Sequence, residues 1–361
     1  MATPAPAAPP VFRHPESSRE ARVEGIDCFR GLAMLAVVLI HVTSATLSRL
    51  DESSAAWLAV AFANRSLQFA VPAFLFMTAL LLARSSLKPS WRVGSYYRGR
   101  LTGVLLPYLV WSALFGLFRV LMGERSLAGL LDWEQWRYWL TAGKAYYHLY
   151  FLVIVLQVYA VFPLLRPLVR ARLSLAAVVA LLAILQAAAY WLNREVLHHR
   201  APASLAISHI VPLGLGLWLG GCLEAYPGWW RALRWTLGLA ALAAWVGFLP
   251  QALSALRDVP VDTFAAAASG WAYSGLLSLI LLGVALSWRW PPRLLVLLGR
   301  HSLQVYLLHA AVIAALNKLF DAQGSAPLLT MMPLFALSIA VPLALAEALR
   351  GTRAARWLFG R

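Results

Sequence analysis

The chain has 361 residues, of which 61% are hydrophobic and only 13% are charged. Soluble domains carry about 25% charged residues, so this composition excludes an ordinary soluble protein and favours an integral membrane protein. The formal net charge of +16 would suit a nucleic-acid-binding protein, but the distribution of the basic residues argues against nucleic acid as a partner.

Apolar segments long enough to cross a bilayer as helices recur along the whole sequence. We place ten of them, at roughly 29–48, 62–83, 101–122, 147–165, 173–192, 205–223, 232–250, 264–287, 294–317 and 327–349. Pro333 and Pro342 interrupt the tenth. The sequence therefore predicts an all-α integral membrane protein with about ten transmembrane helices.

Basic residues gather in every second loop between these segments. If the amino terminus is cytoplasmic, the cytoplasmic segments hold 21 of the 31 lysines and arginines. This alternation is what the positive-inside rule requires. Both termini are therefore predicted to be cytoplasmic, and the positive charge is mostly a topology signal.

The two ends of the chain differ from the apolar segments. The opening MATPAPAAPP lacks the apolar core of a signal peptide, so residues 1–25 are predicted to be a disordered cytoplasmic tail. Residues 26–349 are expected to form one membrane domain, and 350–361 a short basic cytoplasmic tail. The two cysteines, Cys28 and Cys222, give neither a disulfide framework nor a metal site, and no metal is expected.

Arg30 and His41 lie eleven residues apart in the first apolar segment, FRGLAMLAVVLIHV. Eleven residues of an α-helix end about 20° past three full turns, so both side chains share one face, about 16 Å apart along the axis. An ionisable residue inside a membrane span is a candidate functional residue. We therefore expect a basic group at the membrane surface and an imidazole deeper in the membrane.

Two further histidines are expected at middle to outer depth, with His309 at a depth similar to that of His41. His309 lies nine residues beyond Arg300 in the ninth segment, and His148 lies at the outer start of the fourth. A neutral histidine is the usual general base for a hydroxyl group, and the three imidazoles could line one polar cavity. The alternative for each of them is a histidine that packs between helices with its hydrogen bonds satisfied.

Arginines also cluster on the predicted cytoplasmic side before the third apolar segment. Arg98 and Arg100, in WRVGSYYRGRL, are expected beneath Arg30, where they could clamp phosphate groups by charge-assisted hydrogen bonds. The alternative is that they only fix the topology. On the opposite side, the loop 123–146 is rich in tryptophan and tyrosine, which suits either the membrane interface or a lid over an outward-facing site.

Three segments of the chain resemble the acyltransferase-3 family of bacterial integral-membrane O-acyltransferases. They are IDCFRGLAMLAVVLIHV with Arg30 and His41, YYHLYFLVIVLQVYAVFPLL with His148, and GRHSLQVYLLHAAVI with Ser302, Tyr306 and His309. FAVPAFLFMTALLLARS also fits the second span of the family. One departure is that Gly103 stands where many members carry a second basic residue three positions after Arg100.

The resemblance implies a multi-pass protein of the bacterial cytoplasmic membrane that transfers an acyl group, usually acetyl from acetyl-CoA, to a hydroxyl of an extracytoplasmic glycan. Arg30, Arg98 and Arg100 would then hold the acyl-CoA, and His41 would act as the general base. His148, His309 and Tyr306, which shares a face with His309, would contact the substrate. A succinyl or other acyl donor and a lipid-linked saccharide acceptor are also compatible with the resemblance. Two other functions stay open, a transporter or flippase for a glycan intermediate and a non-catalytic scaffold.

Overall fold

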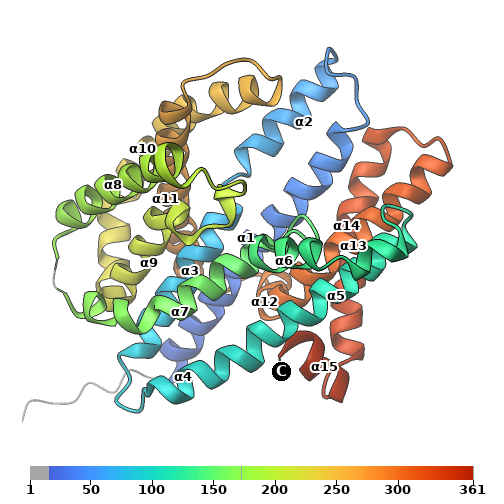
Figure 1. The fold of residues 1–361 in the computed structure, drawn as a ribbon. Coiled ribbons are helices and arrows are strands. Elements are labelled where there is room, and N and C mark those ends of the chain that lie inside the picture. Colours follow the sequence, from blue (N-terminus) through green and yellow to red (C-terminus); the bar gives the residue numbers. More distant parts are fainter. Residues whose placement is uncertain (1–15, 172, 361) are drawn as a thin grey trace, which may run out of the picture.

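The computed structural model describes residues 16–171 and 173–360, and this part of the chain is a bundle of helices (Figure 1). The α-helices are, in chain order, α1 (Glu16–Leu47), α2 (Ala55–Ser66), α3 (Ala70–Ser86), α4 (Val93–Arg100), α5 (Leu106–Leu121), α6 (Trp133–Ala142), α7 (Tyr150–Arg170), α8 (Leu175–Leu192), α9 (Ile210–Cys222), α10 (Tyr226–Leu256), α11 (Thr263–Ser287), α12 (Arg293–Arg300), α13 (Ser302–Ala322), α14 (Pro327–Ala348) and α15 (Arg353–Phe359). Short 3-10 or π segments join several of them.

Within the described residues, nine helical stretches are long and apolar enough to cross a membrane. One of these, Ala206–Leu256, has 51 residues, more than twice the roughly 20 that one crossing needs. A 3-10 turn at Leu223–Ala225 divides it into α9, which packs on α3, and α10, which packs on α11. If this stretch is counted as two membrane passes, the described residues contain ten. The prediction of an all-α membrane protein is confirmed.

Two of the predicted segments are wrong as single helices. The ninth, 294–317, is divided at His301 into α12 and α13. The second, 62–83, belongs to two helices, α2 and α3, with a break between Ser66 and Ala70. The tenth, by contrast, is one helix, because α14 continues through both of its prolines.

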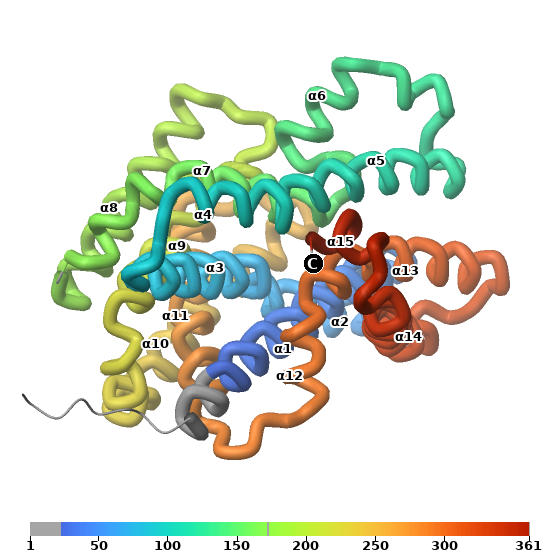
Figure 2. The backbone as a smooth tube through the Cα atoms, turned by 90° about the horizontal axis from the view of Figure 1, so that it is seen from below, coloured from blue at the N-terminus to red at the C-terminus, as the bar shows by residue number. Residues whose placement is uncertain are grey.

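The break at His301 has a packing reason. Helix α12 crosses α1 (Figure 2), and the two backbones approach closely at two glycines. A Cβ on Gly299 would lie 1.8 Å from the carbonyl oxygen of Asp27, and one on Gly31 would lie 2.1 Å from that of Leu295. The chain then changes direction after α12, so that α13 can run alongside α1.

Helix α1 is the element on which the other helices converge. It packs against α2, α3, α11, α12, α13 and α14, and it runs between α3 and α13 in Figure 1. Phe29, Ala33 and Val38 on this helix are completely buried. The polar residues of α1 therefore reach the interior of the protein, and we refer below to the Arg30 end and the Leu47 end of the bundle.

The predicted tails contain helical residues. Residues 1–15 lie outside the described part of the chain, whereas 16–25 belong to α1. The short basic tail at 350–361 contains α15, which packs on α5. There the side chain of Phe359 is buried, and Nε1 of Trp111 donates a 2.8 Å hydrogen bond to the carbonyl oxygen of Leu358.

Candidate functional site

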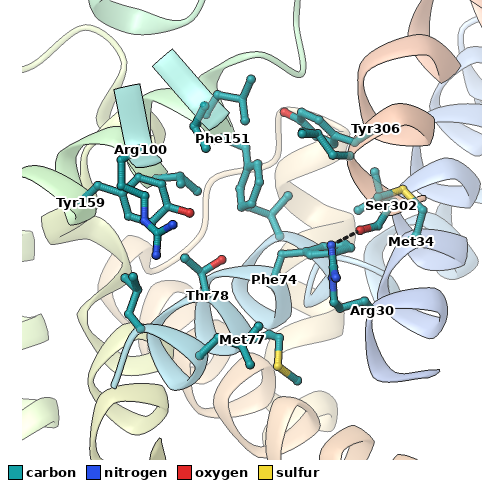
Figure 3. A pocket seen from close by; sticks show the side chains of 18 of the residues that line it. Arg30, Met34, Phe74, Met77, Thr78, Arg100, Phe151, Tyr159, Ser302 and Tyr306 are labelled. Atoms are coloured by element: carbon teal, nitrogen blue, oxygen red, sulfur yellow. Dashed lines mark hydrogen bonds between the residues drawn. The ribbon is translucent and has the colours of Figure 1, made fainter. Parts of the chain in front are cut away.

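A cavity of about 440 Å³ opens beside Arg30, between α1, α3, α7 and α13. We call it the Arg30 cavity. Figure 3 shows Phe74, Met77 and Phe151 in its walls, and Tyr306 at its edge. Most of its surface is apolar, so it suits the hydrocarbon part of a ligand rather than a fully charged one.

Ser302 and Asp27 are among the residues that hold Arg30 in this cavity. Its Nη2 donates a 2.7 Å hydrogen bond to Oγ of Ser302, and its Nη1 lies 3.6 Å from a carboxylate oxygen of Asp27. Ser302 is the first residue of α13. The change of direction at His301 therefore provides the partner that positions Arg30.

Arg100 lies on the wall opposite Arg30 (Figure 3). Its guanidinium carbon lies 4.9 Å from the ring centroid of Tyr159 and 5.1 Å from that of Tyr96, within the range of a cation–π interaction. Arg98, two residues earlier, is exposed and does not line the cavity. The structure therefore brings together two of the three arginines that the sequence singled out.

The three histidines expected at middle to outer depth come together. The ring centroids of His41 and His309 are 5.2 Å apart, and those of His148 and His309 are 5.3 Å apart. His148 and His309 are almost completely buried, at 1% and 0% exposure, whereas His41 is partly exposed. Three elements supply them: α1, the turn before α7, and α13.

Backbone hydrogen bonds fix the buried part of this cluster. The hydroxyl of Tyr306 donates to the carbonyl oxygen of His148, and Nδ1 of His309 lies 3.0 Å from the carbonyl oxygen of Val305. A carbonyl oxygen only accepts hydrogen bonds, so Nδ1 carries the hydrogen of the neutral ring. The basic nitrogen is then Nε2, which is buried and has no hydrogen-bond partner among the described residues.

A second cavity, of about 630 Å³, reaches His41 from the Leu47 end of the bundle. We call it the His41 cavity. It is more polar than the first, with Glu124, Asn317 and Asp321 in its walls. The ring of Tyr147 lies 4.7 Å from that of His41 and also faces this cavity.

The two cavities approach the histidine cluster from opposite ends. Tyr306 lines the first cavity and His41 lines the second, and His309 contacts both of these side chains. Two reactants that entered from opposite ends would meet at this layer. The arrangement is therefore suited to the transfer of a group between them, with an imidazole available to accept a proton.

Sequence reasoning did not single out Tyr147, Tyr159 or Glu124. Tyr147 precedes His148 directly, and this adjacency is the signal that would have found it. Glu124 begins the aromatic-rich outer loop, where a charged residue looks like part of the membrane interface. Nothing in the local pattern around Tyr159 connects it with Arg100, because the contact joins different helices.

Comparison with known proteins gives one match. A family model described as an acyltransferase domain matches residues 23–347, nearly the whole chain. The matched residues include Arg30, Arg100 and the three histidines of the cluster. No curated protein and no solved structure matches the chain. The chain belongs to the acyltransferase-3 family of membrane acyltransferases.

Proposed function

We propose that this protein transfers an acyl group, in the first instance acetyl, from cytoplasmic acyl-CoA to a hydroxyl of an extracytoplasmic glycan or other cell-envelope acceptor. The observation that carries this proposal is the pair of cavities that meet the histidine cluster from opposite ends. The Arg30 end would face the cytoplasm of a bacterial cell, in agreement with the basic residues of the loops on that side.

The Arg30 cavity is the proposed place of the donor arm. Its apolar walls suit the pantetheine chain, and Arg30 and Arg100 supply positive charge on opposite walls. Arg98 lies on the exposed surface, outside this cavity. The distance of about 16 Å between Arg30 and His41 along α1 would let an extended arm bring its thioester to the histidine layer.

The His41 cavity is the proposed place of the acceptor. The hydroxyl oxygen would attack the thioester carbonyl carbon while His41 takes its proton, and the carbon–sulfur bond would break. The sulfur leaves as a thiolate and receives that proton, which gives the ester and free CoA. The reacting groups would be positioned relative to each other by His148, His309 and Tyr306. Such positioning is more effective in a site that is closed to water.

An acyl-histidine intermediate is the mechanistic competitor of direct attack. Mixing the purified protein with acetyl-CoA alone in a single turnover separates the two. Direct transfer predicts no release of CoA without an acceptor, and stoichiometric release would exclude it.

The experiment that tests the function is mass spectrometry of envelope glycans. Cells with the wild-type protein are compared with cells that carry His41→Ala, and we expect loss of an acyl mass increment in the variant. An unchanged set of acylated glycans would overturn the proposal.

A transporter or flippase for a glycan intermediate is the second candidate, because two cavities separated by a buried layer also suit alternating access. The same His41→Ala cells distinguish the two functions. Normal acylation with a loss of glycan export would favour the transporter.

A further inference from the structure

A third cavity, of about 560 Å³, lies at the Arg30 end between α1, α12, α14 and α15. We call it the Arg356 cavity. Part of its wall comes from Arg350, Thr352 and Arg356, which lie beyond the residues 23–347 that the family model matches. The C-terminal segment of this particular chain therefore contributes to the cavity.

The charge of this cavity is positive. Four arginines line it against two carboxylates, and these residues are Arg30, Arg300, Arg350, Arg356, Asp27 and Glu347. Several of them pair with one another. Arg300 lies 3.3 Å from Asp27, and Arg350 lies 3.5 Å from Glu347. In the described part of the chain, Arg356 forms no ion pair, so its charge is available to an anion.

Polar groups at the beginning of α13 give the cavity a second kind of contact. Gln304 is 5% exposed and lines the cavity, and its Oε1 has no hydrogen-bond partner among the described residues. An amide oxygen that lies buried without a donor is unfavourable, and a ligand N–H or O–H could satisfy it. Gln304 belongs to the first turn of α13. The cavity therefore suits a ligand with anionic groups and hydrogen-bond donors together.

Arg30 lines both the Arg356 cavity and the Arg30 cavity, so the two cavities lie next to each other at this side chain. One is polar and basic, and the other is largely apolar. A nucleotide joined to a long uncharged arm matches these two cavities. Its phosphates are anionic and its base and ribose carry N–H and O–H donors, which suit the polar cavity, and its arm suits the apolar one.

From these contacts we propose that the Arg356 cavity binds the phosphorylated nucleotide end of the acyl-CoA donor, with α15 as one of its walls. The pantetheine arm then passes Arg30 into the Arg30 cavity. This inference rests on the proposed function, and it assigns the nucleotide to α12, α13 and α15 rather than to Arg98 on α4.

The test is the binding of CoA and dephospho-CoA, which lacks the 3′-phosphate, to the purified full-length protein in neutral detergent. Arg356→Ala is compared with Arg353→Ala, which removes the same charge from α15 outside the cavity. We expect Arg356→Ala to raise the Kd of CoA about 5–10-fold and to reduce the preference for CoA over dephospho-CoA. Arg353→Ala should change the Kd less than about twofold, as exposed charges do.

A second measurement does not depend on the arginines. A cysteine introduced as Thr352→Cys should be protected by CoA from a water-soluble maleimide, whereas Arg353→Cys should not. Equal protection by inorganic phosphate would overturn the nucleotide assignment in favour of a simple anion site. Protection by phosphatidylglycerol nanodiscs without any effect of CoA would overturn it in favour of a lipid headgroup.

The failure of this inference can be told from the failure of the proposed function. If the wild-type protein does not bind CoA, the proposed donor is wrong. If it binds CoA, and Arg356→Ala and Arg353→Ala alter the Kd by the same factor, only the assignment of the cavity is overturned.

Discussion

Nη2 of Arg30 donates a hydrogen bond of 2.7 Å to Oγ of Ser302, across 272 positions of the chain. The bond joins α1 to the first residue of α13, at the point where α12 ends. The position of Arg30, a proposed donor-binding residue, therefore depends on how α1, α12 and α13 pack together.

Removal of the Ser302 hydroxyl should loosen Arg30 without removing its charge. A hydrogen bond to a charged group contributes about 1.5–3 kcal/mol when it is protected from water. Arg30 is partly exposed, so we expect Ser302→Ala to raise the KM for the acyl donor about 3–10-fold with little change in kcat. The control is Ser85→Ala, which lies in the same cavity but donates only to its own helix. Equal effects of the two substitutions would show that the contact with Arg30 is unimportant.

Arg98 and Arg100 allow a matched comparison on one helix. Arg100 lines the Arg30 cavity, whereas Arg98 is exposed. Arg100→Ala should raise the donor KM about tenfold, because it removes a charge from a largely apolar wall, and Arg98→Ala should raise it less than about twofold. Steady-state kinetics with the two variants check this. A larger increase of the donor KM in Arg98→Ala than in Arg100→Ala would place the donor outside the cavity.

The hydroxyl of Tyr306 contributes to stability through the carbonyl group of His148. Tyr306→Phe leaves that buried carbonyl oxygen without this partner, at an expected cost of about 1–3 kcal/mol in the free energy of unfolding. Tyr97→Phe serves as control, since its hydroxyl donates to the carbonyl oxygen of Ala160 at an exposed position. Unfolding in mixed detergent micelles measures both, and a smaller loss for Tyr306→Phe than for Tyr97→Phe would contradict the assignment.

Gly299 should tolerate no side chain. A Cβ there would lie 1.8 Å from the backbone oxygen of Asp27, so Gly299→Ala must push α12 away from α1, at an expected cost of about 1–3 kcal/mol. Around Gly99 in α4 nothing lies within 4 Å of such a Cβ, and Gly99→Ala should be neutral or stabilising by up to about 1 kcal/mol. The same unfolding measurement compares them. Equal stability of the two variants would show that the crossing of α1 and α12 is not tight.

Hydropathy predicted most of the fold because it reports on the bilayer directly. Long apolar runs mark the crossings, and they located α1, α7, α8, α11 and α14 well. The breaks in the second and ninth segments were missed, although a short polar run stands at each of them, NRSLQ at 64–68 and RHS at 300–302. At the break in the ninth segment, Gly31 and Gly299 make tertiary contacts with distant residues where α12 crosses α1. A local sequence pattern does not contain such contacts.

The candidate site was predictable where it depends on depth along a helix. His41 and His309 were predicted at similar depths on two different helices, and their rings lie in contact; His148, predicted at the outer start of its segment, lies against His309. Side-chain direction on short helices was not predictable. Arg98 and Arg100 looked equivalent in the sequence, yet only Arg100 faces the cavity.

The central claim is that His41 deprotonates an acceptor hydroxyl during transfer from acyl-CoA. Inside-out membrane vesicles from the producing cells, supplied with isotopically labelled acetyl-CoA, test it most directly when label in the envelope glycans is measured by mass spectrometry. His41→Asn is compared with the wild type and with His198→Asn, the same exchange at an exposed position whose φ of 44° asparagine tolerates. We predict that His41→Asn lowers the initial rate of labelling about 10²–10⁴-fold, as loss of a general base does, while His198→Asn keeps the wild-type rate. Labelling by His41→Asn at the wild-type rate would contradict the account.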